Sequence, residues 1–503
     1  MTFEMAFHSA KSRPADQATL EELAKLAQAE GEEERALPLL GHAVKQNPSA
    51  RLWQWKGLLE RAIDEHEQAL ESFAEATRLD PADVSIAHGH ARVAMEAGLD
   101  AQELYMRALK LAPQNGPLMV GLAAARAAAG NGERGAADLQ EVLERVPMWL
   151  YGHEHLAQLV STLGRPDEAT ASLERALEKL PTAVPLWETL LHLQLRRGAH
   201  STLKPILERA EAAKVSSPEF AIYRGVHAAE FDDEVFPFDL FEGAPPNAAA
   251  VLGKSRIRHL LRVGAIDAAL PLIDRELSID QGAELWAYAS TAWRLAGDPR
   301  LEWLEGDPRL VSLTDLSDSP AFLETLAPTL RSLHVAKGEY LDQSVRGGTQ
   351  TDGPLFSRID PVIRQLRKAV VEAVHKHIVQ LPPVDPSHPV LRARRDRRVR
   401  FSGSWSVRLR SGGRHSSHVH PLGWISSALY VALPSQNPDD PPEAGWFTLG
   451  APDEPLGIEL PPWRKIEPKP GTLVLFPSIM WHGTVPFAEG ERLTVAFDVA
   501  PPK

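Results

Sequence analysis

Five evenly spaced prolines constrain the fold of this 503-residue chain more than any other feature. They lie 33, 32, 34 and 34 residues apart and are Pro48, Pro81, Pro113, Pro147 and Pro181. Five positions before each proline lies a small or β-branched residue, namely Ala43, Ala76, Ala108, Val142 and Ala176. Self-similarity at a fixed period is typical of stacked copies of one supersecondary unit. The first half of the chain is therefore predicted to form a repeat array.

A period near 34 with a proline at the end of each unit resembles the tetratricopeptide repeat. The resemblance implies a helix pair per unit, stacked into a curved all-α solenoid with a concave groove. After about residue 200 the register weakens, and the prolines between Phe236 and Pro246 indicate a loop or a degenerate repeat. Helical periodicity returns from Arg256 to Leu295. The solenoid is accordingly assigned to residues 16–300.

The second half has a different pattern, because short segments alternate apolar and polar residues between Gly and Pro turns. The predicted strands are Trp405–Arg410, Ile425–Leu433, Gly445–Leu449, Gly471–Phe476 and Arg492–Val499. Several short strands with histidines at their ends predict a double-stranded β-helix, the jelly-roll fold, over residues 396–503. The chain is thus predicted to be multidomain, a solenoid followed by a jelly-roll domain with flanking helices.

Residues 301–395 are interpreted as a linker with helices that support the barrel. A Gly/Thr-rich stretch, 346–351, predicts a loop that either acts as a mobile lid or substrate-contact segment or is a plain turn. Asp360 and Pro361 suit the start of a helix. Apolar residues then recur at helical spacing up to Ile378, so this helix is expected to pack on the outer face of the barrel.

Composition excludes several classes of protein. A chain of this length needs more than one core. The net charge of −13 argues against a general nucleic-acid binder. Cysteine is absent, which excludes disulfides and thiolate metal sites. The N-terminus lacks the basic start and apolar run of a signal peptide, and no stretch is apolar enough to span a bilayer. We expect a cytoplasmic protein without a membrane partner.

Three histidines in the second half have the spacing of a metal site. His418 and His420 point to the same side if the backbone is extended, and His482 follows a separate strand. Three such ligands on one face of an octahedron leave positions open for a bidentate 2-oxo acid and dioxygen. Arg492 and Thr494 place a cation and a hydroxyl on one strand face, suited to a carboxylate. The pattern favours an Fe(II)- and 2-oxoglutarate-dependent oxygenase.

A second His-x-His sequence, at His375 and His377, is predicted not to bind metal. It lies in the helix that begins near Pro361. Residues i and i+2 of a helix diverge by about 200°. These two histidines are expected at the surface or partly packed.

Longer strings from residue 343 onward resemble a bacterial family of 2-oxoglutarate/Fe(II) oxygenases with N-terminal tetratricopeptide repeats. The strings are QSVRGGTQT, WSVRL, GRHSSHVHP and FPSIMWHGTVPF. In the wider prolyl-hydroxylase-like superfamily, a His-x-Asp pair and a distal His bind iron, and a basic residue binds the distal carboxylate of 2-oxoglutarate. The resemblance assigns these roles to His418, His482 and Arg492. His420 stands where Asp is usual, so either three histidines bind iron or His420 lies outside the ligand set and water completes the face.

Further residues are assigned by position. Ser406 and Arg408 share a strand face near the site and are candidates for contacting 2-oxoglutarate, alongside Thr494. Arg346, Gln350 and Trp481 are candidates for contacting the substrate. His415 is expected to lie outside the ligand set or at the surface. The basic run 391–400 lacks interleaved aromatic residues, so a solvated face is favoured over an anion-binding patch.

The resemblance implies hydroxylation or another oxidation of a C–H bond with O2, on a peptide or protein recruited by the repeats. Two alternatives remain open. A three-His iron dioxygenase that does not use 2-oxoglutarate would share the metal ligands but have no use for Arg492. A non-enzymatic repeat scaffold with a relict barrel would not need the ligands.

Overall fold

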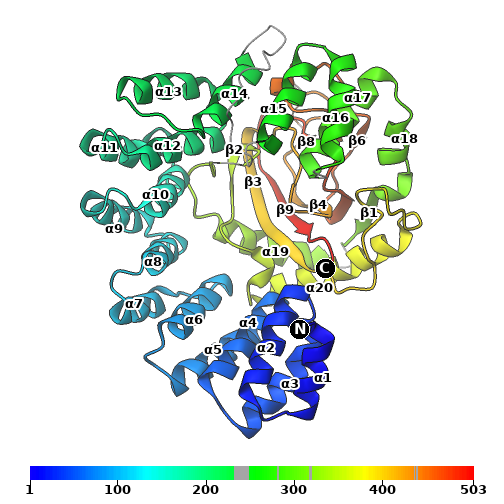
Figure 1. Ribbon diagram of the computed structural model, residues 1–503. Coiled ribbons are helices and arrows are strands. Elements are labelled where there is room, and N and C mark those ends of the chain that lie inside the picture. Colours follow the sequence, from blue (N-terminus) through cyan, green and yellow to red (C-terminus); the bar gives the residue numbers. More distant parts are fainter. Residues whose placement is uncertain (232–248, 280–281, 317–319, 342, 436, 438–439) are drawn as a thin grey trace.

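The computed structural model in Figure 1 describes the chain except for residues 232–248, 280–281, 317–319, 342, 436 and 438–439. An arc of helices and a domain built around two β-sheets lie side by side, and the two chain termini lie close together. Both parts of the predicted fold, the helical solenoid and the jelly-roll domain, are confirmed. The loop predicted between Phe236 and Pro246 lies outside the described residues.

The arc consists of antiparallel helix pairs whose period matches the prolines. Its helices are α1 (Phe3–Ser12), α2 (Gln17–Glu30), α3 (Glu33–Gln46), α4 (Ala50–Ala62), α5 (His66–Leu79), α6 (Val84–Glu96), α7 (Gln102–Leu111), α8 (Gly116–Ala128), α9 (Gly132–Arg145), α10 (Leu150–Thr162), α11 (Ala171–Lys179), α12 (Val184–Arg196), α13 (Leu203–Ala212) and α14 (Phe220–Phe231). Each proline of the repeat ends one pair just before the next begins. Four of the five small residues, Ala43, Ala76, Ala108 and Ala176, are almost fully buried where helices cross.

Within each pair the chain reverses through one residue in the left-handed backbone conformation. These residues are Gly31, Asp64, Gly98, Gly130, Gly164 and Gly198, with φ between 61° and 87°. Glycine adopts this conformation without steric cost, which explains its use at five of the six turns. The six turns therefore recur once per repeat and form one edge of the array.

The remaining helices are α15 (Ala249–Arg262), α16 (Ile266–Leu277), α17 (Ala283–Ala296), α18 (Arg300–Glu305), α19 (Pro320–Leu333) and α20 (Pro361–Gln380). Short 3-10 helices are η1 (Pro166–Glu168), η2 (His200–Thr202), η5 (Pro308–Leu310), η6 (Leu355–Ser357) and η7 (Glu454–Leu456). Among the described residues, no helix combines the length and apolar composition needed to cross a bilayer.

The second domain contains two antiparallel sheets. The six-stranded sheet has the order β1-β7-β4-β9-β3-β2, and the three-stranded sheet has the order β6-β5-β8. The strands are β1 (Ser312–Asp315), β2 (Val345–Gln350), β3 (Phe401–His415), β4 (Ile425–Ala432), β5 (Phe447–Leu449), β6 (Arg464–Ile466), β7 (Thr472–Pro477), β8 (His482–Thr484) and β9 (Arg492–Val499). All five predicted strands are present, whereas β1, β2, β6 and β8 were not predicted.

The loop predicted at 346–351 is wrong, because most of this stretch is strand β2, paired with β3. Its glycines mark a bulge, since the register shifts between Arg346 and Gly348 and Gly347 has a φ of 69°. Strands β1 and β2 thus belong to the main sheet although they lie in the stretch interpreted as linker and helices.

Helix α20 begins at Pro361, as predicted, but Asp360 accepts a hydrogen bond from Arg358 Nε (2.8 Å) instead of capping the helix. Its apolar residues share one hydrophobic core with the large sheet, including Leu366 of the helix and Phe497 of β9. Trp286 and Trp293 of α17 belong to the same core. The boundary expected at residue 300 therefore falls inside a continuous core.

The basic run 391–400 binds the first repeats. Arg397 pairs with Glu32 (2.5 Å), Arg400 with Glu33 (2.5 Å) and Arg398 with Glu65 (2.5 Å). The expected solvated face is wrong for these arginines, because the sequence of the run alone cannot show that acidic turns more than 300 residues earlier lie opposite.

Further turns along the same edge also contact the sheet domain. The Ala97 carbonyl accepts a hydrogen bond from Ile359 N (3.1 Å), and the Thr162 carbonyl accepts one from Lys337 N (2.8 Å). After α14, Arg258 of α15 pairs with Asp453 (3.1 Å), and Arg294 of α17 donates to the Gly450 carbonyl (3.0 Å). The helices are thus attached to the sheet domain at the first repeats, at intermediate turns and at α15 and α17.

Replacing Arg400 with serine tests this attachment. Glu33 is 2% exposed in its side chain, so removal of Arg400 leaves a buried carboxylate without a cation. Removing one partner of a buried ion pair lowers the free energy of unfolding by roughly 3 kcal/mol, the low end of the usual range. We expect amide hydrogen exchange in residues 31–34 to rise by about a hundredfold. The control is Arg394→Ser, whose pair with Asp396 is solvent-exposed and whose loss should leave this exchange unchanged.

Candidate metal centre

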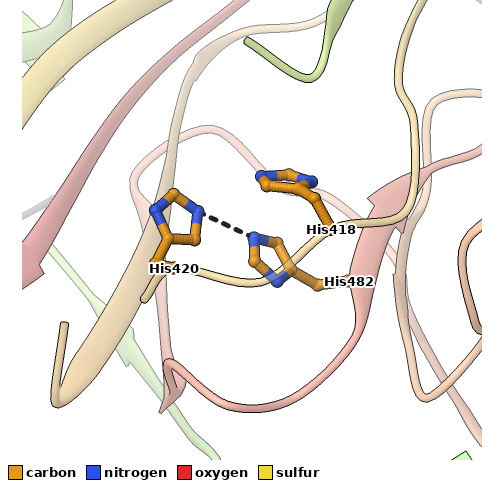
Figure 2. Close-up of side chains that lie close together, drawn as sticks. All are labelled: His418, His420 and His482. Atoms are coloured by element: carbon orange, nitrogen blue, oxygen red, sulfur yellow. Dashed lines mark hydrogen bonds between the residues drawn. The ribbon is translucent and has the colours of Figure 1, made fainter. Parts of the chain in front are cut away.

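The three histidines converge between the two sheets (Figure 2). His418 lies just beyond β3 and forms an isolated antiparallel bridge with His482, the first residue of β8. Their backbone amides and carbonyls exchange hydrogen bonds of 3.0 and 3.1 Å. His420 is fixed by its amide, which donates to the Ser478 carbonyl (3.0 Å). Backbone pairing thus places side chains that are more than sixty residues apart in one cluster.

Each imidazole is oriented by an oxygen atom at Nδ1. The Nδ1 of His418 lies 2.8 Å from the Ser416 carbonyl, and that of His482 lies 3.0 Å from the Met480 carbonyl. The Nδ1 of His420 lies 2.8 Å from Oδ2 of Asp498. A carbonyl accepts hydrogen bonds only, so Nδ1 carries the proton in His418 and His482. The Nε2 atom of a neutral ring then presents its lone pair, as a metal ligand must.

The donor atoms have the spacing that a single metal ion requires. One ligand atom from each histidine lies within 4.8 Å of the other two. The Nε2 atoms of His420 and His482 are 3.1 Å apart, the contact drawn as a dashed line in Figure 2. Metal–nitrogen bonds are about 2.1 Å long, so two such donors at a right angle are about 3 Å apart. The pair formed by His420 and His482 therefore has the spacing of two neighbouring ligands of one metal ion, and the donor atom of His418 lies close enough to belong to the same cluster.

Burial keeps two of these histidines neutral. Desolvation lowers the pKa of His418 and of His482 well below the ordinary value of 6.5, and neighbouring imidazoles lower both further. Metal binding requires the unprotonated ring. Both imidazoles could therefore bind a metal ion at neutral pH without first losing a proton.

A buried cation lines the same pocket. The side chain of Arg492 is 2% exposed, and its guanidinium carbon lies 5.2 Å from the centre of the Tyr430 ring. Within the described part of the chain no carboxylate forms an ion pair with Arg492, and its Nε has no hydrogen-bond partner. Desolvation by burial lowers the pKa of Arg492, and the neighbouring Tyr430 partly opposes this shift. Thr494, two residues on, lines the pocket as predicted from strand alternation.

Other side chains complete the pocket, and most of them were not predicted from the sequence. Trp405 stacks on His420, with ring centres 5.6 Å apart and planes 19° apart. Ser344 places its Oγ 3.0 Å from Nε2 of His418 and 3.1 Å from Nδ1 of His415. Gln343 and Gln350 complete this wall, and Oε1 of Gln350 is buried without a hydrogen-bond partner. Gln350 was among the predicted substrate contacts, and a ligand could satisfy this oxygen.

Ser406 and Arg408 do not line the pocket, in contrast to the prediction. In the register of β3 with β9, Ser406 pairs with Val495 and Arg408 with Leu493, which lie on the opposite face from Arg492 and Thr494. Ser406 donates to the Thr494 carbonyl (3.0 Å), and Arg408 pairs with Glu491 (2.5 Å). Alternation along β3 showed that they share a face but not which face meets the pocket.

Two predicted substrate residues also lie elsewhere. The Trp481 indole donates to the Ala287 carbonyl and to Thr291 Oγ1 of α17, both at 3.0 Å. Arg346 is exposed and donates to the Gln343 carbonyl (2.6 Å). Trp481 therefore joins the helices to the sheet domain, and neither residue lines the pocket.

His415 stacks on His418 with ring centres 5.9 Å apart and lines the pocket outside the three-histidine cluster. Burial lowers its pKa to about 3, and Arg492 adds to this shift. On α20, His375 is exposed and His377 is buried with a pKa lowered to about 4 by desolvation. These two diverge on the helix and take no part in the cluster, as expected.

Comparison with known families identifies both parts of the chain. Residues 403–498 match the family described as "Putative 2OG-Fe(II) oxygenase", and residues 50–83 match a tetratricopeptide repeat. The first match includes His418, His420, His482 and Arg492. The chain therefore carries a 2OG-Fe(II) oxygenase domain with tetratricopeptide repeats before it. No curated protein matches the sequence significantly.

Similar solved structures cover parts of the chain. A tetratricopeptide-repeat protein of Thermus thermophilus is 22% identical over 36% of this chain and 97% of its own, with a TM-score of 0.26. A tetratricopeptide-repeat protein from Parabacteroides merdae is 18% identical over 50% of this chain and 96% of its own, with a TM-score of 0.29. A prolyl-4-hydroxylase of Pseudomonas putida is 15% identical over 43% of this chain and 98% of its own, with a TM-score of 0.26.

Removing one imidazole tests the metal centre. Wild-type protein is expected to bind one Fe(II) or Co(II) per chain, and His482→Ala should weaken this binding by at least about 10–100-fold, the usual effect of losing a metal-site partner. Anaerobic titration calorimetry measures it. His375→Ala, at an exposed position on α20, is the matched control and should bind like wild type. Equal affinity of the His482 variant would exclude His482 as a ligand.

Proposed function

We propose that the protein is an Fe(II)- and 2-oxoglutarate-dependent dioxygenase. The observation that carries the proposal is one pocket lined by both a cluster of three imidazoles and a buried arginine without an acidic partner among the described residues. When bound, Fe(II) and 2-oxoglutarate would supply the electrons that activate O2, so that one oxygen atom enters succinate as 2-oxoglutarate loses carbon dioxide and the other enters the second substrate. The oxidised group is a C–H bond of a second substrate.

The chain's own residues bind and orient the reactants. His418, His420 and His482 would hold iron through Nε2, with each ring fixed at Nδ1. Arg492 would bind the distal carboxylate of 2-oxoglutarate in a fork of two N–H donors, with the Thr494 hydroxyl beside it. The apolar walls, including Phe447 and Ala496, exclude water and strengthen these charge interactions.

Arg492 favours this function over a three-histidine dioxygenase that does not use 2-oxoglutarate. A buried guanidinium loses its hydration, and this cost is offset only by a paired anion or strong hydrogen bonds. A dianionic cosubstrate in the adjoining cavity supplies that anion. An intact cluster of three donors likewise disfavours a relict barrel.

Arg492→Leu separates these functions. The substitution removes a charge-assisted hydrogen bond worth about 1.5–3 kcal/mol, so affinity for 2-oxoglutarate should fall by about one to two orders of magnitude. Iron affinity and thermal stability should be retained, because an unpaired buried cation is replaced by an apolar side chain. Succinate release as a function of 2-oxoglutarate concentration provides the measurement.

Arg408→Leu is the control, since this arginine lies on the other face of the sheet. It should leave the 2-oxoglutarate constant unchanged. Wild-type behaviour of the Arg492 variant would mean that the cosubstrate binds elsewhere or is not used.

We further propose that the repeats recruit a peptide or protein substrate. Helices α8 and α10 lie on the inner side of the arc, towards the sheet domain, whereas α9 and α11 lie outside (Figure 1). The less buried residues of α10 recur at helical spacing and include Tyr151 and His155, whose rings lie 4.0 Å apart. An accessible aromatic pair on a helix of the inner side of a solenoid is suited to holding an extended chain.

A peptide library tests this recruitment. With Fe(II), 2-oxoglutarate and O2, wild-type protein should produce peptides heavier by one oxygen atom, detected by mass spectrometry. Tyr151→Ala should reduce their yield about tenfold, because one lost aromatic contact costs roughly 1–2 kcal/mol at an interface. Succinate release without peptide should not change. Equal oxidation by both proteins would mean that this surface does not bind the substrate.

A further inference from the structure

Asp498 lies behind the cluster in contact with one of its imidazoles. Its Oδ2 is 2.8 Å from Nδ1 of His420, on the side of the ring opposite Nε2. The side chain is buried, and no arginine or lysine of the described chain forms an ion pair with it. Because the negative charge has no other cation to balance it, its electrostatic effect falls mainly on His420 and on any ion that His420 binds.

One serine bonds the carboxylate, and a second serine joins that contact to His420. Ser426 Oγ donates to Oδ1 of Asp498 (2.6 Å) and lies 2.8 Å from Ser478 Oγ. The Ser478 carbonyl accepts the amide of His420 (3.0 Å). Ser426 of β4 therefore holds Asp498, and Ser478 in the turn after β7 holds His420, so neighbouring parts of the large sheet fix both residues.

Asp498 supplies the negative charge that a carboxylate ligand would otherwise bring to the metal site. Fe(II) oxygenases commonly use two histidines and one carboxylate, which lowers the charge of the metal site by one. Three neutral imidazoles alone leave that charge at +2, and Arg492 adds one more. Asp498 returns one negative charge through the ring of His420. The site then carries +2 in total, which balances a 2-oxoglutarate dianion.

We infer that Asp498 is a positioning residue that makes His420 serve as the third ligand in place of a carboxylate. It fixes the tautomer with the proton on Nδ1, orients Nε2 towards the ion and increases the donor strength of the ring. The inference rests on the proposed function and adds a residue outside the ligand set.

Metal affinity is the test, measured with Co(II) alone by calorimetry and by its visible absorption. Asp498→Asn keeps the shape but removes the charge, and should weaken Co(II) binding by about 10–100-fold. Ser426→Ala removes the other hydrogen bond of the same carboxylate and keeps the charge, so it should weaken binding by less than Asp498→Asn does. Equal Co(II) affinity of wild type and Asp498→Asn would overturn the inference while leaving the proposed function intact. Failure of wild type to bind Co(II) or Fe(II) would instead overturn the metal site itself.

The same substitution of Asp498 in a His420→Asp variant shows whether its effect on Co(II) affinity acts through His420 or through the structure in general. In His420→Asp the new carboxylate lies beside Asp498, and like charges at this distance repel each other. Adding Asp498→Asn to this variant should therefore keep or raise Co(II) affinity, the opposite sign to its effect in wild type. If Asp498→Asn weakens binding by the same factor in both backgrounds, or unfolds the protein in both, Asp498 does not act through residue 420 and the inference is wrong.

Discussion

The two faces of strand β9 organise the sheet domain. The strand lies between β3 and β4 in the large sheet. One face carries Leu493, Val495, Phe497 and Val499, which pack in the core shared with the flanking helices. The other face carries Arg492, Thr494, Ala496 and Asp498. The first three line the pocket, and Asp498 contacts His420. Because a shift of one residue would exchange these faces, burial of the apolar set fixes the position of the polar set.

Sequence alone could predict those features that depend on local periodicity. The repeat period, the strands and the helix at Pro361 follow from patterns within a few residues or from spacing along the chain. The same rule applied once more would have found Asp498, since it is the only acidic residue on the pocket face of β9. Asp498 lies four residues after Thr494 on the same face, but the sequence does not show that His420 lies opposite it.

Other features depend on contacts between distant segments. Which face of β3 meets the pocket is set by its register with β9, so Ser406 and Arg408 could not be placed from their own strand. Trp481 follows a predicted strand, but its partner on α17 lies 190 residues earlier. Strand β2 resembles a loop because its glycines are needed for a bulge. In each case a partner elsewhere in the chain decides between two structures that the local sequence permits.

Attachment of the helices to the sheet domain has a consequence for the shape of the repeat array. The curvature of a solenoid follows from the small rotation between successive repeats. Here the first repeats are held by Arg400 and its neighbours, the turns at Ala97 and Thr162 by backbone hydrogen bonds, and the helices after α14 by Arg258 and Arg294. The sheet domain therefore restrains the curvature of the array. A groove of fixed width binds with little loss of conformational entropy but accepts few shapes. Adding or removing one unit of about 34 residues would move some of these attachment points away from their partners.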